Sequence, residues 1–151
     1  DILLNYSVDE IDLSGKENAL VANNVKIAYS SSVVTSYVYD SEAKVYKRFV
    51  NGKEHTDAVT NNQYTAKNII TYQIKNSTIT NDPKGRQEFD NVGEGTGYYI
   101  TDGYAVKIKW KKTSRFAQTV YMYEDGTEIT VNDGNTYIQI QPESQNLTIS
   151  E

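Results

Sequence analysis

The chain has 151 residues, no cysteine and a formal net charge of −5. This length fits one domain with a core of its own, and the lack of cysteine excludes disulfides, zinc–thiolate sites and cysteine nucleophiles within this segment. The acidic balance argues against nucleic acid or an anionic lipid surface as the main partner, and no apolar run approaches the roughly 20 residues of a membrane-spanning helix.

Short turn signals divide the chain. Three Asx-Gly dipeptides, at 51–52, 102–103 and 125–126, lie between runs in which apolar and polar residues alternate. Asn or Asp followed by Gly is typical of the type I′ turn of a β-hairpin, because both central residues of that turn need a positive φ. The 13 tyrosines suit the half-buried surfaces of strands. The pattern therefore predicts three hairpins in an antiparallel β-protein.

The first 24 residues have little periodic pattern. We interpret 1–24 as a lead-in from an upstream domain, in which 16–22 forms at most a short helix. Strands are then predicted at 25–29, 33–39, 45–50, 53–57, 68–74, 86–92, 98–101, 104–111, 120–124, 127–131 and 136–141. Residues 25–142 are thus expected to form a β-rich domain, followed by a C-terminal tail at 143–151. The fold class predicted is all-β, with antiparallel hairpins forming a sandwich or a partly open barrel.

Four polar and aromatic side chains gather on the first predicted hairpin. A two-residue turn at Asn51-Gly52 fixes the register, which places Arg48 opposite His55 and Tyr46 opposite Asp57. One face would then hold a cation beside the only histidine of the chain. This face is our candidate site for an anionic or polar ligand, or for contact with another domain. The alternative is a solvated face on which Arg48 and Asp57 form an ion pair of little energetic weight.

The second predicted hairpin has the clearest alternation. Apolar side chains at even positions are expected to face the core, and lysines at odd positions the solvent: Tyr104, Val106, Ile108 and Trp110 against Lys107, Lys109 and Lys111. Extending the register from the turn places Gly97 opposite Ile108 and Gly95 opposite Trp110, where glycines leave room for large side chains. The lysines would protect a sheet edge or, alternatively, contact an anionic polymer or lipid headgroups.

The third predicted hairpin turns at Asp125-Gly126. A two-residue turn there pairs Met122 with Ile129 on the inner face and points Tyr121 and Tyr123 outward. Outward tyrosines either stack on a sugar or a protein partner, or pack across strands on a wet face.

Residue types that support catalysis are scarce. The chain has one histidine, no cysteine and no serine in a Gly-x-Ser-x-Gly turn, and no run has the spacing of a calcium loop. We therefore predict no catalytic residue, no metal site and no cofactor, and we regard an enzyme as the less favoured class.

With the strands placed, an ordered set of segments resembles the C-terminal domain of the YerB-like lipoproteins, a family of unknown function found mainly in Gram-positive bacteria. The resemblance covers about 25–142 and rests on these segments: Tyr39-Asp40, Val45-Tyr46-Lys47-Arg48, Asn51-Gly52-Lys53-Glu54-His55-Thr56-Asp57, Thr65-Ala66-Lys67-Asn68-Ile69-Ile70, Gly93-Glu94-Gly95-Thr96-Gly97, Asp102-Gly103, Trp110-Lys111-Lys112, Tyr123-Glu124-Asp125-Gly126 and Asn132-Asp133-Gly134-Asn135-Thr136-Tyr137-Ile138.

The resemblance implies an upstream domain and a lipid-modified cysteine outside this segment. It thereby implies an extracytoplasmic protein of the cell envelope, tethered to the membrane only through that lipid. We expect a binding or scaffold module whose partners are the upstream domain and an envelope ligand, and not nucleic acid. The alternative is one wall of an envelope enzyme, with its site at the interface with the upstream domain.

Overall fold

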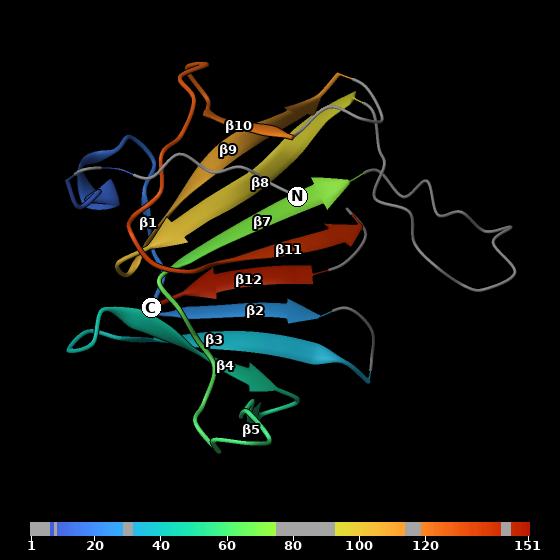
Figure 1. Cartoon of the computed structure of the whole chain (residues 1–151). Helices are drawn as coiled ribbons and strands as arrows, with labels where there is room; N and C mark the ends of the chain where they lie inside the picture. The colour runs from blue at the N-terminus through green and yellow to red at the C-terminus, as the bar shows by residue number, and fades with distance from the viewer. Residues whose placement is uncertain (1–6, 8, 29–31, 75–92, 114–118, 143–145) are drawn as a thin grey trace, which may run out of the picture.

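The structure is a computed structural model that describes residues 7, 9–28, 32–74, 93–113, 119–142 and 146–151. These residues form an all-β fold of two sheets (Figure 1). The predicted fold class is thus confirmed, as a sandwich-like arrangement without a closed barrel. The strand predicted at 86–92 lies outside the described residues.

The first sheet has the strand order β1-β9-β8-β7-β11, and β10 lies beside β1 on the same edge of β9. Its strands are β1 (Leu20–Val21), β7 (Asn68–Ile74), β8 (Gly93–Thr101), β9 (Tyr104–Lys112), β10 (Val120–Tyr123) and β11 (Thr136–Pro142). All pairs are antiparallel except β7 and β11, which run side by side in the same direction (Figure 1). That pair departs from the predicted hairpins, because a long connection between the two strands permits parallel pairing.

The second sheet has the order β12-β2-β3-β4-β5, and β6 also pairs with β4. Its strands are β2 (Asn24–Ala28), β3 (Val34–Asp40), β4 (Val45–Val50), β5 (Lys53–Glu54), β6 (Thr65–Ala66) and β12 (Asn146–Ser150). Strand β12 falls within the stretch that we expected as a C-terminal tail, and it pairs along its whole length with β2.

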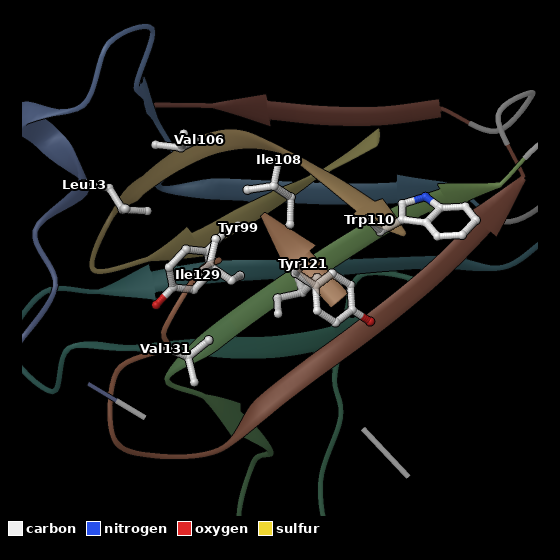
Figure 2. Packing of buried hydrophobic residues seen from close by; sticks show 9 residues of the cluster. Leu13, Tyr99, Val106, Ile108, Trp110, Tyr121, Ile129 and Val131 are labelled. Atoms are coloured by element: carbon white, nitrogen blue, oxygen red, sulfur yellow. The ribbon is translucent and has the colours of Figure 1, made fainter. Parts of the chain in front are cut away.

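Two cores lie on opposite faces of the first sheet. Between the two sheets, Ile69 and Ile100 of the first pack with Val25, Tyr37 and Tyr46 of the second. The other face of the first sheet is covered by the N-terminal segment and by the segment between β10 and β11. Figure 2 shows the labelled side chains of that second core: Leu13, Tyr99, Val106, Ile108, Trp110, Tyr121, Ile129 and Val131.

Two of the predicted turns are confirmed. Val50 opposes Lys53 across Asn51-Gly52, and Thr101 opposes Tyr104 across Asp102-Gly103. Both central residues of each turn have a positive φ. The register on β8 and β9 also places Gly97 opposite Ile108 and Gly95 opposite Trp110, as predicted. Trp110 is 3% exposed, so its predicted burial is confirmed.

The lysine-bearing strand β9 is not an edge strand. β8 lies along one side of it, and β1 and β10 lie along parts of the other. Protection of an open edge therefore does not explain Lys107, Lys109 and Lys111, which are exposed on the face opposite Trp110.

The predicted register of the third hairpin is wrong by one residue. The amide of Tyr123 donates to the carbonyl of Thr127, and Met122 bridges Glu128 instead of Ile129. The turn contains three residues and ends on Gly126 at φ +92°, which is the second common hairpin loop. Because a slip of one residue exchanges the two faces, Tyr121 points into the core at 3% exposure and not outward.

The N-terminal segment joins the first sheet. Its 3-10 turn η1 (Leu13–Gly15) buries Leu13 completely, and Leu20 of β1 pairs with Ala105. The prediction of at most a short helix near the N-terminus is confirmed, although it lies before 16–22 and part of that stretch is a strand. In the described part of the chain, no helix has the length and apolar character to cross a bilayer.

Candidate functional site

Strand β4 ends in the tight turn that positions Arg48 and His55. The amide of His55 donates to the carbonyl of Arg48 at 3.0 Å, so the two residues oppose each other as predicted. On the other flank of Arg48, Tyr37 of β3 is its register partner. Cross-strand neighbours share one face of a sheet, and this face is the one that packs toward the first sheet.

The guanidinium of Arg48 is surrounded by aromatic rings. Its Nε donates to the hydroxyl of Tyr37 at 3.1 Å, and its Nη1 lies 2.5 Å from Nδ1 of His55. Because arginine can only donate, Nδ1 of His55 is the acceptor in this contact. The guanidinium carbon also lies 5.3 Å from the ring centre of Tyr137 on β11, within the range of a cation–π contact. Arg48 thus bridges the margins of the two sheets.

His55 stands at the base of a hairpin arm, which we define as residues 55–64. Its ring packs against that of Tyr64 with 4.5 Å between centres. The amide of Tyr64 donates to the carbonyl of His55, and the amide of Arg48 donates to the carbonyl of Tyr64. The side-chain amide of Gln63 adds a bond of 2.8 Å to the carbonyl of Arg48. These bonds fasten both ends of the arm to β4.

The other two predicted site residues lie elsewhere. Tyr46 is fully buried and pairs with Ala66 of β6, so the predicted pairing with Asp57 is wrong. The reason is that β5 ends at Glu54 and the chain leaves the sheet. Asp57 instead forms the turn at the tip of the arm, where its Oδ1 accepts from the amides of Val59 and Thr60. The structure therefore joins Arg48 and His55, and adds Tyr37, Tyr64 and Tyr137 to them.

A second polar cluster was not predicted from the sequence. Lys67, which separates β6 from β7, places Nζ 2.7 Å from Asp102 and 2.8 Å from Glu10. Lys44 also contacts Glu10 at 3.3 Å. Behind Lys67, the buried side chain of Asn132 donates to the hydroxyl of Thr101 at 3.0 Å.

Buried amides extend this cluster into the core. The hydroxyl of Tyr99 donates to Oδ1 of Asn68, and the side-chain amide of Asn68 donates to the carbonyl of Asn132. The Oδ1 atom of Asn132 in turn accepts a hydrogen bond of 2.6 Å from the amide of Ile11. The side chains of Tyr99, Asn68 and Asn132 are thus each hydrogen-bonded, as burial requires. The network fastens the N-terminal segment to the first sheet.

The charges of the cluster stabilise one another. The hydrogen bond from Lys67 lowers the pKa of Glu10 to about 2. Burial raises the pKa of Asp102, against the opposing effect of the Lys67 ammonium. For Lys67 itself, burial disfavours the charge, but hydrogen bonds to Asp102 and Glu10 outweigh it and raise its pKa. The directions of the Glu10 and Lys67 pKa shifts, each towards the charged form, fit an ion network with a structural role.

The hollow beside this cluster has a volume of about 340 Å³ and is lined by Ser7, Asp9, Glu10, Lys67, Asn132 and Asp133. No set of three or more His, Cys, Asp and Glu side chains within the described ranges is arranged to hold a metal ion. Since Lys67 and Lys44 together balance the charges of Glu10 and Asp102, we retain the Arg48–His55 face as the candidate site.

Comparison with known proteins agrees with the architecture. Residues 25–138 match the profile of a family described as the C-terminal domain of a protein of unknown function, DUF3048. The crystal structure of the YerB protein from Bacillus subtilis superposes with a TM-score of 0.73 and 23% sequence identity. The match covers 96% of this chain but 46% of YerB, so this chain spans less than half the length of that protein. No curated protein matches the sequence.

Proposed function

This chain belongs to the family of DUF3048 C-terminal domains, and we propose that it is a non-enzymatic binding or scaffold module of an extracytoplasmic lipoprotein. In this proposal the Arg48–His55 face takes up a carboxylate or phosphate group. That group belongs either to an envelope ligand or to an upstream domain of the same protein.

The observation that carries the proposal is the surroundings of Arg48. Arg48 is half-buried, and no carboxylate of the described residues lies within 4.0 Å of its guanidinium. Tyr37 and His55 occupy Nε and one position on Nη1, which leaves further N–H donors for another acceptor. A partly desolvated cation is stabilised by a counter-charge, and the arginine fork suits carboxylate and phosphate. An external carboxylate or phosphate would supply the counter-charge and the acceptors for these N–H groups.

The aromatic side chains around Arg48 suit recognition. Tyr37 and Tyr137 face the Arg48 cation from two different strands, and Tyr64 packs against His55 beside it. Tyrosine and arginine are enriched at the centres of protein interfaces. The same set contains no nucleophile with an adjacent base, which is why we propose binding and not catalysis.

The extracytoplasmic location rests on the resemblance to the YerB-like lipoproteins and is tested separately. We expect the full-length protein to sediment with membranes and to incorporate an alkyne-labelled fatty acid at an N-terminal cysteine. Replacement of that cysteine by alanine should abolish the labelling. Recovery of unlabelled protein in the cytosolic fraction would contradict the location without affecting the argument from Arg48.

Anion binding is tested directly on the 151-residue chain. Sodium acetate and inorganic phosphate are titrated at constant ionic strength while amide and arginine Nε–H resonances are followed by NMR. We expect saturable shifts near Tyr37, Arg48 and His55 that Arg48→Gln abolishes and Lys109→Gln retains. Equal shifts in the wild type, Arg48→Gln and Lys109→Gln, or shifts that never saturate, would contradict anion binding. The Arg48–His55 face would then be a solvated surface.

A further inference from the structure

We propose that Arg48 and the hairpin arm form one docking surface for a protein partner that presents a carboxylate near a bulky apolar side chain. Arg48 pairs with the carboxylate, and Val59, at the tip of the arm, packs against the apolar side chain. The inference rests on the proposed function and deepens it, because it names the chemistry of the partner.

The arm is held by hydrogen bonds from its base to its tip. Beyond the bonds of His55 and Tyr64 to β4, Thr56 and Gln63 form an antiparallel bridge. The amide of Asp57 then donates to the carbonyl of Asn62 at 2.8 Å. The arm is therefore a short hairpin closed by its own backbone bonds beyond the end of β5.

The tip is a closed turn and not a loose loop. Oδ1 of Asp57 accepts from the amide of Val59 at 2.7 Å and from that of Thr60 at 3.2 Å. The amide of Asn61 donates to the carbonyl of Asp57 at 2.7 Å, and Asn61 adopts φ +62°. An Asp side chain that takes the amides following it fixes such a turn. Binding would therefore cost little conformational entropy at the tip.

This turn holds an apolar side chain in water. Val59 is 92% exposed, whereas the other exposed large apolar side chains of the described residues lie between 37% and 44%. Tyr64, one of those others, lies at the base of the arm beside His55. Val59 thus offers an apolar contact at the tip of an arm whose base lies beside Arg48 and its aromatic neighbours, and arginine and tyrosine are the residues enriched at interface hot spots.

The chemistry of the arm favours a protein over a membrane or a small anion. Residues 55–64 include no lysine or arginine and contain the acidic Asp57, whereas attraction to an anionic membrane needs basic groups near the surface. Two extended steps, about 7 Å in all at about 3.3 Å each, lead from His55 to the turn at the tip, and Val59 lies beyond them within that turn. A small anion on Arg48 does not span that distance, but a protein segment does.

The probe is a phage-displayed library of random 12-residue peptides, selected on the immobilised 151-residue chain. We expect enriched peptides to combine Asp or Glu with a bulky apolar residue. The affinity of the best synthetic peptide is then measured by fluorescence polarisation against four proteins. Val59→Ser and Arg48→Gln should each weaken binding at least tenfold, and the matched control Val120→Ser, on β10, should stay within twofold of the wild type.

The other outcomes overturn the inference, and they do so separately from the proposed function. If acetate or phosphate binds in a way that depends on Arg48 while no acidic, apolar peptide is selected, the result would support the proposed function and contradict the docking surface. If Arg48→Gln weakens peptide binding but Val59→Ser does not, the arm is not part of the contact. Binding to phosphatidylglycerol vesicles that Val59→Ser abolishes, again without selected peptides, would make the partner a membrane.

Discussion

Tyr46 on the second sheet and Gly103 at the turn between β8 and β9 of the first sheet are joined by a hydrogen bond of 3.0 Å, which the amide of Gly103 donates to the tyrosine hydroxyl. The same hydroxyl donates to the carbonyl of Ala22 at 2.8 Å. One buried oxygen therefore connects the two sheets to the segment that leads into β2.

Removal of this hydroxyl should destabilise the fold. Tyr46→Phe leaves the buried amide of Gly103 without its acceptor, which costs about 1–3 kcal/mol in the free energy of unfolding. Urea denaturation monitored by circular dichroism measures the change. Tyr64→Phe, at a residue that is 37% exposed, is the control and should stay within about 0.5 kcal/mol of the wild type. A Tyr46→Phe protein as stable as the control would mean that the hydroxyl does not connect the sheets.

Alkaline pH should unfold the protein through its buried tyrosines. Burial raises the pKa of both Tyr46 and Tyr99 above the ordinary value of 10.0. The stabilisation is complete below about pH 10 and is lost as the pH rises, because the unfolded chain releases these protons first. Tyr99→Phe should make the fall of unfolding free energy above pH 10 shallower by up to about 1.4 kcal/mol for each pH unit. Urea titrations at pH 9 to 11 give the slope, and an unchanged slope would contradict the burial of this hydroxyl.

Loss of the Lys67 ammonium should leave Asp102 partly buried without its cation. Lys67→Gln is expected to cost about 1.5–3 kcal/mol, the range for a hydrogen bond to a charged group. Asp102→Asn in the Lys67→Gln background should cost less than Asp102→Asn alone, since the charge that needed Lys67 is gone. A double-mutant cycle by urea denaturation measures the coupling. Strictly additive effects would show that the contact between Lys67 and Asp102 contributes nothing to the free energy of unfolding.

Gly134 should tolerate a side chain less well than Gly52. A Cβ at Gly134 would lie 2.7 Å from Cβ of Lys67, while a Cβ at Gly52 meets no atom within 4 Å. Both glycines have a positive φ, but +79° at Gly52 lies near the left-handed helical region, where an alanine costs about 1–2 kcal/mol, whereas +137° at Gly134 lies outside it. The loss of unfolding free energy in Gly134→Ala should therefore exceed that in Gly52→Ala by about 1 kcal/mol or more, owing to the collision and the less favourable backbone angle together. Thermal unfolding of the two variants side by side decides the order, and equal losses would refute the close approach.

Local turn chemistry made part of the fold predictable. Asn51-Gly52 and Asp102-Gly103 force positive φ at adjacent positions, and each register then follows by counting outward. That is why Arg48 could be placed opposite His55. The Asp125-Gly126 dipeptide has the same composition but closes a three-residue loop, because only Gly126 takes the positive φ. The dipeptide alone does not distinguish the two loops.

The remainder of the site depends on contacts between distant segments. Tyr137 reaches Arg48 from β11, and Asn132 meets Asn68 and Thr101 from a different part of the chain. No periodicity marks a buried asparagine. The departure of the chain from β5 did have a local signal, since Asp57 is followed by Asn61 and Asn62, residues that favour turns.

The pairing of β2 with β12 has a consequence for how the protein is made. Residues 24–28 find one of their two neighbouring strands only at 146–150, so the second sheet cannot close until the ribosome has synthesised more than 115 further residues. β7 likewise waits for β11. A topology of such high contact order folds slowly, and a nascent chain carrying it remains extended for longer, with the unpaired edge of β2 open to other chains in the meantime.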